Sequence, residues 1–311
     1  MKNENSRIQE IFSKSIFRGE VRFMEPMSDH TSLRIGGPAE VFTVPQDLIS
    51  LKNMRLTLKR EQIPFFTLGG GTNILVRDGG MEGAVISFNS FRKIEVLSED
   101  DEYVQLSVET GTPLQRLVNF SKENGYSGLE GLVGIPGTVG GAIVGNAGAF
   151  GYEMKDVLVL VEIMNAEGEI GKCKAEKIDF GYRRSSISSA EVILSAEIRL
   201  KKDKKKNVST KVEDFLQKKW KQQPISESSA GCVFKNPPEL YAGMLIDEVG
   251  CKGMRIGDVE VSTIHANFFI NKGRATASDF LHLINEVAHR VKEKFGVVLE
   301  PEIKIIGKDV N

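Results

Sequence analysis

The chain has 311 residues, with 41 basic and 42 acidic side chains and a formal net charge of -1. This length allows two or three domains, and a content of 41% hydrophobic and 27% charged residues is typical of a soluble globular protein. A charge balance so close to zero creates no field that would attract nucleic acid or an anionic membrane, so neither is an expected partner. The N-terminal segment MKNENSRIQEIFSKS lacks the apolar core of a secretory signal.

The cysteines indicate a reducing compartment. Cys173, Cys232 and Cys251 are odd in number and widely spaced, which does not fit a disulfide framework. We therefore expect a cytoplasmic protein. No pair of cysteines has metal-ligand spacing and the histidines are scattered, so no metal site is expected.

Helical and strand patterns are mixed along the chain. Apolar periodicity, proline at helix starts and glycine at helix ends predict helices over 6–15, 48–62, 113–125, 212–223 and 277–295. Runs rich in β-branched residues predict strands over 39–45, 64–71, 83–88, 157–165, 169–173, 191–202 and 297–306, and two more within 93–110. Strands and helices that do not alternate strictly indicate an α+β fold.

The charged stretch KKDKKKNVSTK is the best candidate for a linker, near residues 201–209, although a solvated hairpin tip or a helix start is also reasonable. With this boundary we expect three domains, which cover residues 1–90, 91–203 and 204–311.

Two glycine-rich loops are the first functional signal. The sequence LGGGTNILV follows a predicted strand, and its three glycines allow backbone N–H groups to converge on an anion. The second loop, GLEGLVGIPGTVGGAIVGNAGAFG, combines many glycines with apolar residues that favour burial. For a lone run of three glycines, a tight turn without ligand would be the better explanation of the first loop. Close backbone approach to a ligand explains the second loop better than flexibility does. Neither loop matches a Rossmann fingerprint or a P-loop.

Seven motifs in order make the chain resemble the UDP-N-acetylenolpyruvoylglucosamine reductase family. The motifs are TSLRIGG, LGGGTNILV, GIPGTVGGAIVGNAGAFG, FGYRRS, AGCVFKNP, HANFFIN and LEPEI. The resemblance extends from about Ser32 to Gly307 and is with the compact, type II branch. It implies an FAD-binding fold of the vanillyl-alcohol-oxidase type in two subdomains, followed by a C-terminal substrate-binding domain.

The same resemblance implies FAD as cofactor and NADPH as hydride donor. We expect non-covalent FAD, because neither glycine loop contains a histidine that could attach the flavin. It implies that FAD is held by two sets of residues, Leu68, Gly69, Gly70, Gly71, Thr72, Asn73 and Ile74 in the first loop and Gly131, Ile135, Pro136, Gly137, Thr138, Gly140, Gly141, Ala142, Asn146 and Ala147 in the second.

Three residues match the catalytic positions of the family. Arg183 would hold the substrate carboxylate, with Arg184 as the alternative, because neighbours on a strand face opposite ways. Glu302 would stabilise the developing charge, with Glu300 as the competitor. Cys232 stands where family members carry serine, and its thiol can deliver a proton. A surface arginine and a small buried cysteine are the simpler alternatives.

The implied substrate is UDP-N-acetylglucosamine enolpyruvate, and the implied product is a precursor of peptidoglycan. Six residues are candidates for binding it, namely Tyr182, Lys221, Lys235, Asn236, His265 and Asn267. A solvated lysine face and a satisfied buried histidine are the competing interpretations. We expect a monomer.

Three other functions fit part of the sequence. Another FAD oxidase of the same fold would use both glycine loops. A transferase with Cys232 as nucleophile and His265 as base would leave these loops unexplained. A nucleotide-binding regulator without catalysis is the third.

Overall fold

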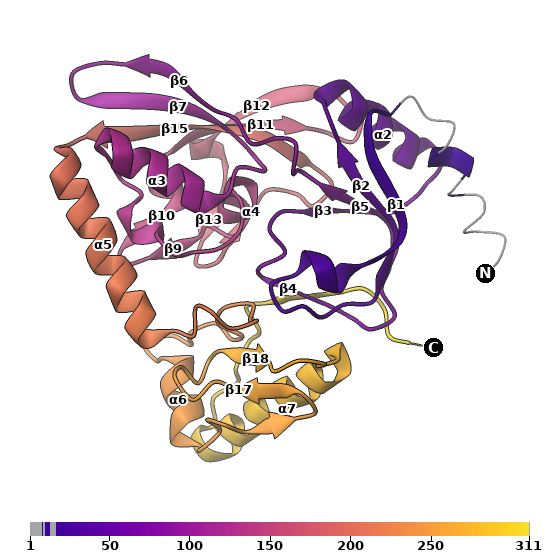
Figure 1. The fold of residues 1–311 in the computed structure, drawn as a ribbon, viewed down its shortest axis with the longest axis vertical. Helices are drawn as coiled ribbons and strands as arrows, with labels where there is room; N and C mark the ends of the chain where they lie inside the picture. Colours follow the sequence, from indigo (N-terminus) through magenta and orange to yellow (C-terminus); the bar gives the residue numbers. More distant parts are fainter. Residues whose placement is uncertain (1–7, 9, 13–16, 311) are drawn as a thin grey trace. The chain divides into compact units, whose positions relative to one another are not determined.

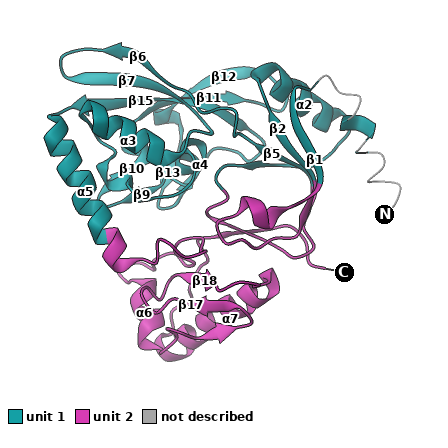
Figure 2. Ribbon diagram, viewed as in Figure 1, with its two compact units in different colours: residues 1–23, 41–70, 83–218 teal, residues 24–40, 71–82, 219–311 magenta. Residues whose placement is uncertain are grey.

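The structure is a computed structural model that describes residues 8, 10–12 and 17–310. Strands and helices mix along the chain (Figure 1), as expected for an α+β fold. The chain forms two compact units (Figure 2). Unit 1 comprises residues 1–23, 41–70 and 83–218, and unit 2 comprises residues 24–40, 71–82 and 219–311. The three contiguous domains expected from the sequence stay a prediction.

A four-stranded sheet with a covering helix begins the fold. Its strand order is β1-β2-β5-β3, with bounds β1 Gly19–Pro26, β2 Pro38–Pro45, β5 Met81–Ser87 and β3 Phe65–Leu68. Helix α2 (Leu48–Arg60) starts where the Asp47 side chain accepts a hydrogen bond from Ser50 N at 2.7 Å. Its buried residues, Leu51, Met54 and Leu58, recur every three or four positions and pack into a core with the sheet.

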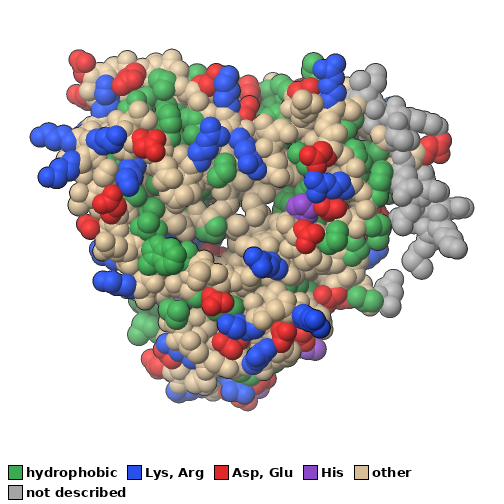
Figure 3. Space-filling model, in the orientation of Figure 1, with side chains coloured by type: hydrophobic (Ala, Val, Ile, Leu, Met, Phe, Trp, Pro, Cys, Tyr) green, Lys and Arg blue, Asp and Glu red, His purple; other side chains and the backbone are tan. Residues whose placement is uncertain are grey.

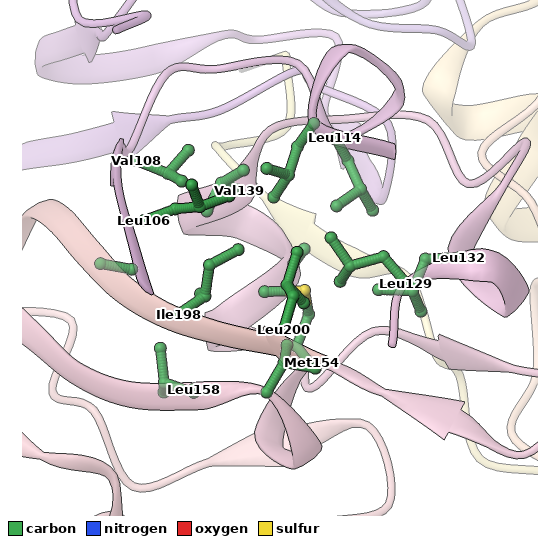
Figure 4. Packing of buried hydrophobic residues seen from close by; sticks show 14 of the residues in the cluster. Leu106, Val108, Leu114, Leu129, Leu132, Val139, Met154, Leu158, Ile198 and Leu200 are labelled. Atoms are coloured by element: carbon green, nitrogen blue, oxygen red, sulfur yellow. The ribbon is translucent and has the colours of Figure 1, made fainter. Parts of the chain in front are cut away.

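A larger sheet forms the rest of unit 1, in the order β12-β11-β15-β7-β6, and β8 also pairs with β15. The bounds are β6 Ile94–Glu99, β7 Tyr103–Glu109, β8 Tyr126–Ser127, β11 Leu158–Met164, β12 Ile170–Lys174 and β15 Val192–Lys202. Helices α3 (Leu114–Asn124) and α4 (Val139–Val144) pack on its core, where leucine and valine side chains of the strands and helices point toward one another (Figure 4). This core fixes the second glycine loop.

Unit 2 is built around helix α7 (Ala277–Phe295), which has the predicted bounds. A reciprocal pair of hydrogen bonds between Thr276 and Asp279 caps its start, and Gly296 ends it with φ +69°. The other elements are α6 Ala242–Glu248, the sheet β16 Arg255–Ile256, β17 Val259–Val261 and β18 Phe269–Asn271, and the parallel pair β4 Ile74–Val76 and β19 Lys304–Ile306.

Some expected elements differ from the structure. The charged stretch is a helix start and not a linker, because α5 (Lys205–Gln222) begins seven residues before the predicted helix. Asp203 favours this start, since its side chain accepts from Lys204 N at 2.6 Å and from Asn207 Nδ2 at 2.8 Å. The strand predicted over 297–306 is reduced to β19. The helix predicted over 6–15 falls mostly outside the described residues.

The surface carries charges of both signs. On the face shown in Figure 3, basic and acidic side chains are interspersed. Among the helices that the structure describes, none is long and apolar enough to cross a membrane.

Candidate functional site

The two glycine loops meet within unit 1. Gly69 follows β3, and a Cβ placed on it would lie only 2.7 Å from Thr138 Oγ1 and 4.0 Å from Gly141 Cα. The first of these distances is too short for any side chain. Glycine at this position therefore lets the end of β3 approach the start of α4, which places segments from both predicted cofactor loops side by side.

Access for a ligand explains only some of the glycines in the second loop. A Cβ on Gly140 would lie 1.9 Å from Thr110 Oγ1, and one on Gly131 would lie 2.4 Å from Ala149 O. Packing within the protein thus requires glycine at both positions, whereas the sequence interpretation explained the glycines of this loop by close approach to a ligand. A Cβ on Gly141 would meet only Thr138 Oγ1, at 3.7 Å, and Gly141 is exposed.

The amides around the start of α4 are partly used by the protein. Val139 N donates to Thr112 O and Gly140 N donates to Thr110 O, both at 2.9 Å. Thr138 Oγ1 accepts from Gly141 N at 3.4 Å. In the first loop, no acceptor within the described residues takes the N–H of Gly70 or Gly71. The backbone of the first loop is therefore the stronger candidate for contact with a phosphate.

A short hairpin places the candidate arginine beside the second loop. Strands β13 (Phe180–Gly181) and β14 (Arg184–Ser185) pair, and Tyr182 and Arg183 form the turn between them. Arg183 has a left-handed backbone, with φ +58°. Its Nη1 donates to Gly148 O at 3.0 Å, and its guanidinium lies 5.3 Å from the ring centre of Tyr182. The strained turn thus directs Arg183 toward the glycine loop.

Neighbouring side chains hold this hairpin in place. Asn146 Nδ2 donates to Gly181 O at 3.3 Å and to Glu153 Oε2 at 3.1 Å, and Ser185 Oγ donates to Val144 O at 2.9 Å. Asn146 therefore supports the hairpin, and contact between Asn146 and the cofactor stays a prediction. Sequence reasoning missed Ser185, although it lies in the quoted FGYRRS motif.

The alternative arginine points elsewhere. Arg184 is exposed, and its Nη1 forms an ion pair with Asp179 Oδ2 at 2.7 Å. The two arginines therefore differ in environment, and Arg183 is the better candidate for a role in catalysis.

In unit 2, three separate segments come together around Cys232. Cys232 lies opposite Phe268 in an antiparallel bridge, and Phe234 lies opposite Pro301 in another. Glu302 N donates to Val233 O at 2.7 Å. The segments that carry the candidate proton donor and the candidate glutamate are thus adjacent.

The first glycine loop reaches this cluster through Asn73. Asn73 Nδ2 donates to Glu302 O at 3.3 Å, and Lys304 N donates to Asn73 O at 3.0 Å. Ile74 then continues into β4, which pairs with β19. No local sequence pattern signals this contact, because the partners are far apart in the chain.

His265 and Asn267 occupy structural positions beside Cys232. His265 Nδ1 accepts from Asn267 N at 3.2 Å, its ring packs on Phe268 with centres 4.9 Å apart, and burial lowers the pKa of His265. The bond to Nδ1 and the packing of the ring on Phe268 fit the satisfied histidine. Asn267 is buried, and its side chain bonds to the backbone of Phe234.

The remaining candidates lie at or near the surface. Lys235 Nζ is 2.5 Å from Glu300 Oε1 in an ion pair, so the competitor of Glu302 is held by a lysine. Asn236 Oδ1 accepts from Ala242 N at 3.0 Å. Lys221 and Tyr182 are exposed. Substrate contact by these residues stays a prediction.

Comparisons with known proteins agree along the chain. A family model for an FAD binding domain matches residues 39–174, and one for the C-terminal domain of UDP-N-acetylenolpyruvoylglucosamine reductase matches residues 223–306. A protein of that name from Syntrophus aciditrophicus is 40% identical over 296 residues, which is 95% of each chain. One from Caldanaerobacter subterraneus is 43% identical over 291 residues, 93% of this chain and 95% of the other.

A solved structure gives the same result. The crystal structure of UDP-N-acetylenolpyruvylglucosamine reductase (MurB) from Thermus caldophilus is 35% identical, has a TM-score of 0.79 and aligns with 93% of this chain and 99% of its own. The match confirms the predicted fold class and the family resemblance.

Proposed function

The chain belongs to the UDP-N-acetylenolpyruvoylglucosamine reductase family, and we propose that it reduces the enolpyruvyl group of UDP-N-acetylglucosamine enolpyruvate with NADPH and bound FAD. The product is UDP-N-acetylmuramate, a precursor of peptidoglycan. The observation that carries this proposal is the 40% identity over 95% of both chains to a reductase of that name. Cytoplasmic location and a monomeric state remain predictions.

The reaction adds a hydride and a proton across one carbon–carbon double bond. The hydride goes to the terminal carbon, which becomes a methyl group, and negative charge develops on the adjacent carbon and its carboxylate. A proton then adds to the adjacent carbon, and NADPH becomes NADP⁺. FAD supplies the transfer of hydride from the nicotinamide to the substrate.

The residues present fit FAD. Where the two loops meet, Gly69 has no side chain and contacts Thr138, and Gly141 is exposed close to this contact. The free N–H groups of Gly70 and Gly71, within the described residues, suit a pyrophosphate. The first and second loops would hold the cofactor through these groups.

Each catalytic candidate has a distinct task. The guanidinium of Arg183 can hold the carboxylate on which negative charge develops through two parallel hydrogen bonds. Cys232 can give its thiol proton to the adjacent carbon and be reprotonated by water. Glu302, if protonated, can donate a hydrogen bond to the developing charge.

A spectrum and a turnover assay test the proposal. Purified protein reconstituted with FAD should show flavin absorption bands, and NADPH oxidation in the absence of oxygen should depend on the UDP-sugar. A protein that oxidises NADPH only with oxygen would be an oxidase of the same fold. A protein that does not bind FAD would contradict the proposal.

A further inference from the structure

Asn267 makes an unusual set of contacts with the segment that follows Cys232. Its side chain is 2% exposed. Its Oδ1 accepts from Phe234 N at 2.9 Å, and its Nδ2 donates to Phe234 O at 2.8 Å. Its backbone carbonyl accepts from Val233 N at 2.8 Å. One buried residue thus holds two consecutive residues, Val233 and Phe234, through both its side chain and its backbone.

The opposite edge of the same segment is held by the chain around Glu302. Glu302 N donates to Val233 O at 2.7 Å, and Lys235 N donates to Glu300 O at 2.8 Å. Residues 233–235 therefore lie between Asn267 on one side and residues 300–302 on the other. A displacement of this segment would move Cys232 and would also change the support of Glu302.

Cys232 lies between Gly231 and this segment. Gly231 has φ +77°, and a Cβ added to it would meet no atom of the described residues within 4 Å. Cys232 pairs with Phe268 in an isolated antiparallel bridge. The position of Cys232 is therefore set by this bridge together with the segment that follows it.

The chemistry of the amide explains why asparagine is needed. Only a side chain with one donor and one acceptor at this length can bond both the N–H and the C=O of one buried residue. Aspartate has the same shape, but it would place a second acceptor against Phe234 O. The buried Phe234 carbonyl would then have no donor, and the added carboxylate oxygen would repel it. Both effects would displace residues 233–235.

We propose that Asn267 is a positioning residue that fixes Cys232, and with it the segment that carries Glu302, for delivery of the proton to the substrate. This inference rests on the proposed function. It replaces the expectation from sequence that Asn267 binds substrate, because the main bonds of its amide are made within the protein.

The test compares Asn267→Asp with the matched variant Asn271→Asp. Asn271 is also a buried asparagine of unit 2, and its side chain also bonds backbone on both ends, donating to Leu33 O at 2.9 Å and accepting from Gly273 N at 2.8 Å. Both variants are made in a Cys173→Ser background, since Cys173 is the other partly exposed cysteine. Circular dichroism and thermal unfolding monitor the fold.

The first measurement is the rate at which iodoacetamide alkylates Cys232, followed by peptide mass spectrometry. We expect Asn267→Asp to raise this rate about tenfold, which corresponds to about 1.4 kcal/mol, because a half-buried thiol is released. Asn271→Asp should leave it within about twofold. Equal rates in the two variants would overturn the inference. This measurement does not depend on the identity of the substrate.

The second measurement separates the two half-reactions of the FAD-loaded enzyme by stopped flow. Asn267→Asp should leave flavin reduction by NADPH within about twofold, and it should slow substrate reduction about tenfold to a hundredfold, as misplacement by about 1 Å does. An equal loss in both half-reactions would mean a structural role alone and would overturn the inference. If the wild-type enzyme reduces no substrate, the proposed function fails, whereas the alkylation rates still decide the positioning role.

A second variant, Asn267→Ser, tests the inference if Asn267→Asp folds poorly. Asn267→Ser keeps a hydroxyl that can bond only one of the two Phe234 groups, and it avoids the added charge. It should change both measurements in the same direction and by less. An unchanged alkylation rate in a folded Asn267→Ser protein would overturn the inference.

Discussion

Replacing Gly141 with alanine distinguishes an effect on the stability of the fold from an effect on FAD binding. Gly141 lies in the first turn of α4, is exposed and has no left-handed backbone. An added Cβ would lie 3.7 Å from Thr138 Oγ1, which is an ordinary van der Waals distance. Nothing else in the described residues lies within 4 Å of it, so the fold can accept the methyl group.

The two expected effects have opposite signs. Alanine in place of glycine in a helix adds up to about 1 kcal/mol of helix stability, so the free energy of unfolding of the apo-protein should rise by roughly 0.5–1 kcal/mol. If FAD lies against the bare backbone here, an inserted methyl group costs about 1–3 kcal/mol of binding. This corresponds to a Kd for FAD about fivefold to a hundredfold higher.

Chemical denaturation of the apo-protein and fluorescence titration with FAD measure the two quantities. Gly171→Ala is the matched control, because a Cβ at this exposed position in β12 would meet no atom of the described residues within 4 Å. It should leave the Kd for FAD unchanged. A Gly141→Ala protein with unchanged FAD affinity would refute the view that this turn of α4 lies against the cofactor.

Three further substitutions test individual residues. Arg183→Lys should slow substrate reduction about tenfold or more, because lysine cannot form two parallel hydrogen bonds with a carboxylate. Arg184→Lys should leave the rate of substrate reduction within about twofold in the same stopped-flow experiment. Glu302→Gln should slow substrate reduction and leave flavin reduction by NADPH unchanged, and an equal effect on both would exclude a role in stabilising charge. Burial lowers the pKa of His265 in the folded protein. The unfolded chain therefore binds more protons below about pH 6.5, and the stability that His265 contributes is lost as the pH falls through that range. The decrease in the midpoint of denaturation between about pH 7 and pH 5 should be smaller in His265→Gln, and an identical decrease would show that this histidine has no part in it.

Elements with strong local signals were predictable from the sequence. Helix α7 has its predicted bounds because the capping pair at Thr276 and the left-handed Gly296 both lie next to it in the chain. The sequence did not predict the start of α5, because a lysine-rich stretch has no apolar periodicity, although the Asp203 side chain bonds Lys204 N and Asn207 Nδ2 at this end of the helix. The strand expected over 297–306 is reduced to β19, because β4 offers only three partners and Pro301 forms only an isolated bridge, with Phe234.

The candidate site depends on contacts that no local pattern encodes. The motifs identified Arg183, Cys232 and Glu302, but Arg183 lies in a left-handed turn and not on a strand. The contacts between Asn73 and Glu302 and between Asn267 and Phe234 join segments that are distant in the chain. Only the folded chain therefore distinguishes a residue that faces a ligand from one that holds another residue in place.

The mass of the UDP-sugar after single turnover tests the proposed reaction most directly. FAD-loaded enzyme is incubated without oxygen with UDP-N-acetylglucosamine enolpyruvate and one equivalent of NADPH, and the sugar nucleotide is analysed by mass spectrometry. We predict a product heavier by two hydrogen atoms, formed in step with NADP⁺. An unchanged sugar nucleotide in the presence of flavin that NADPH has reduced would contradict the account.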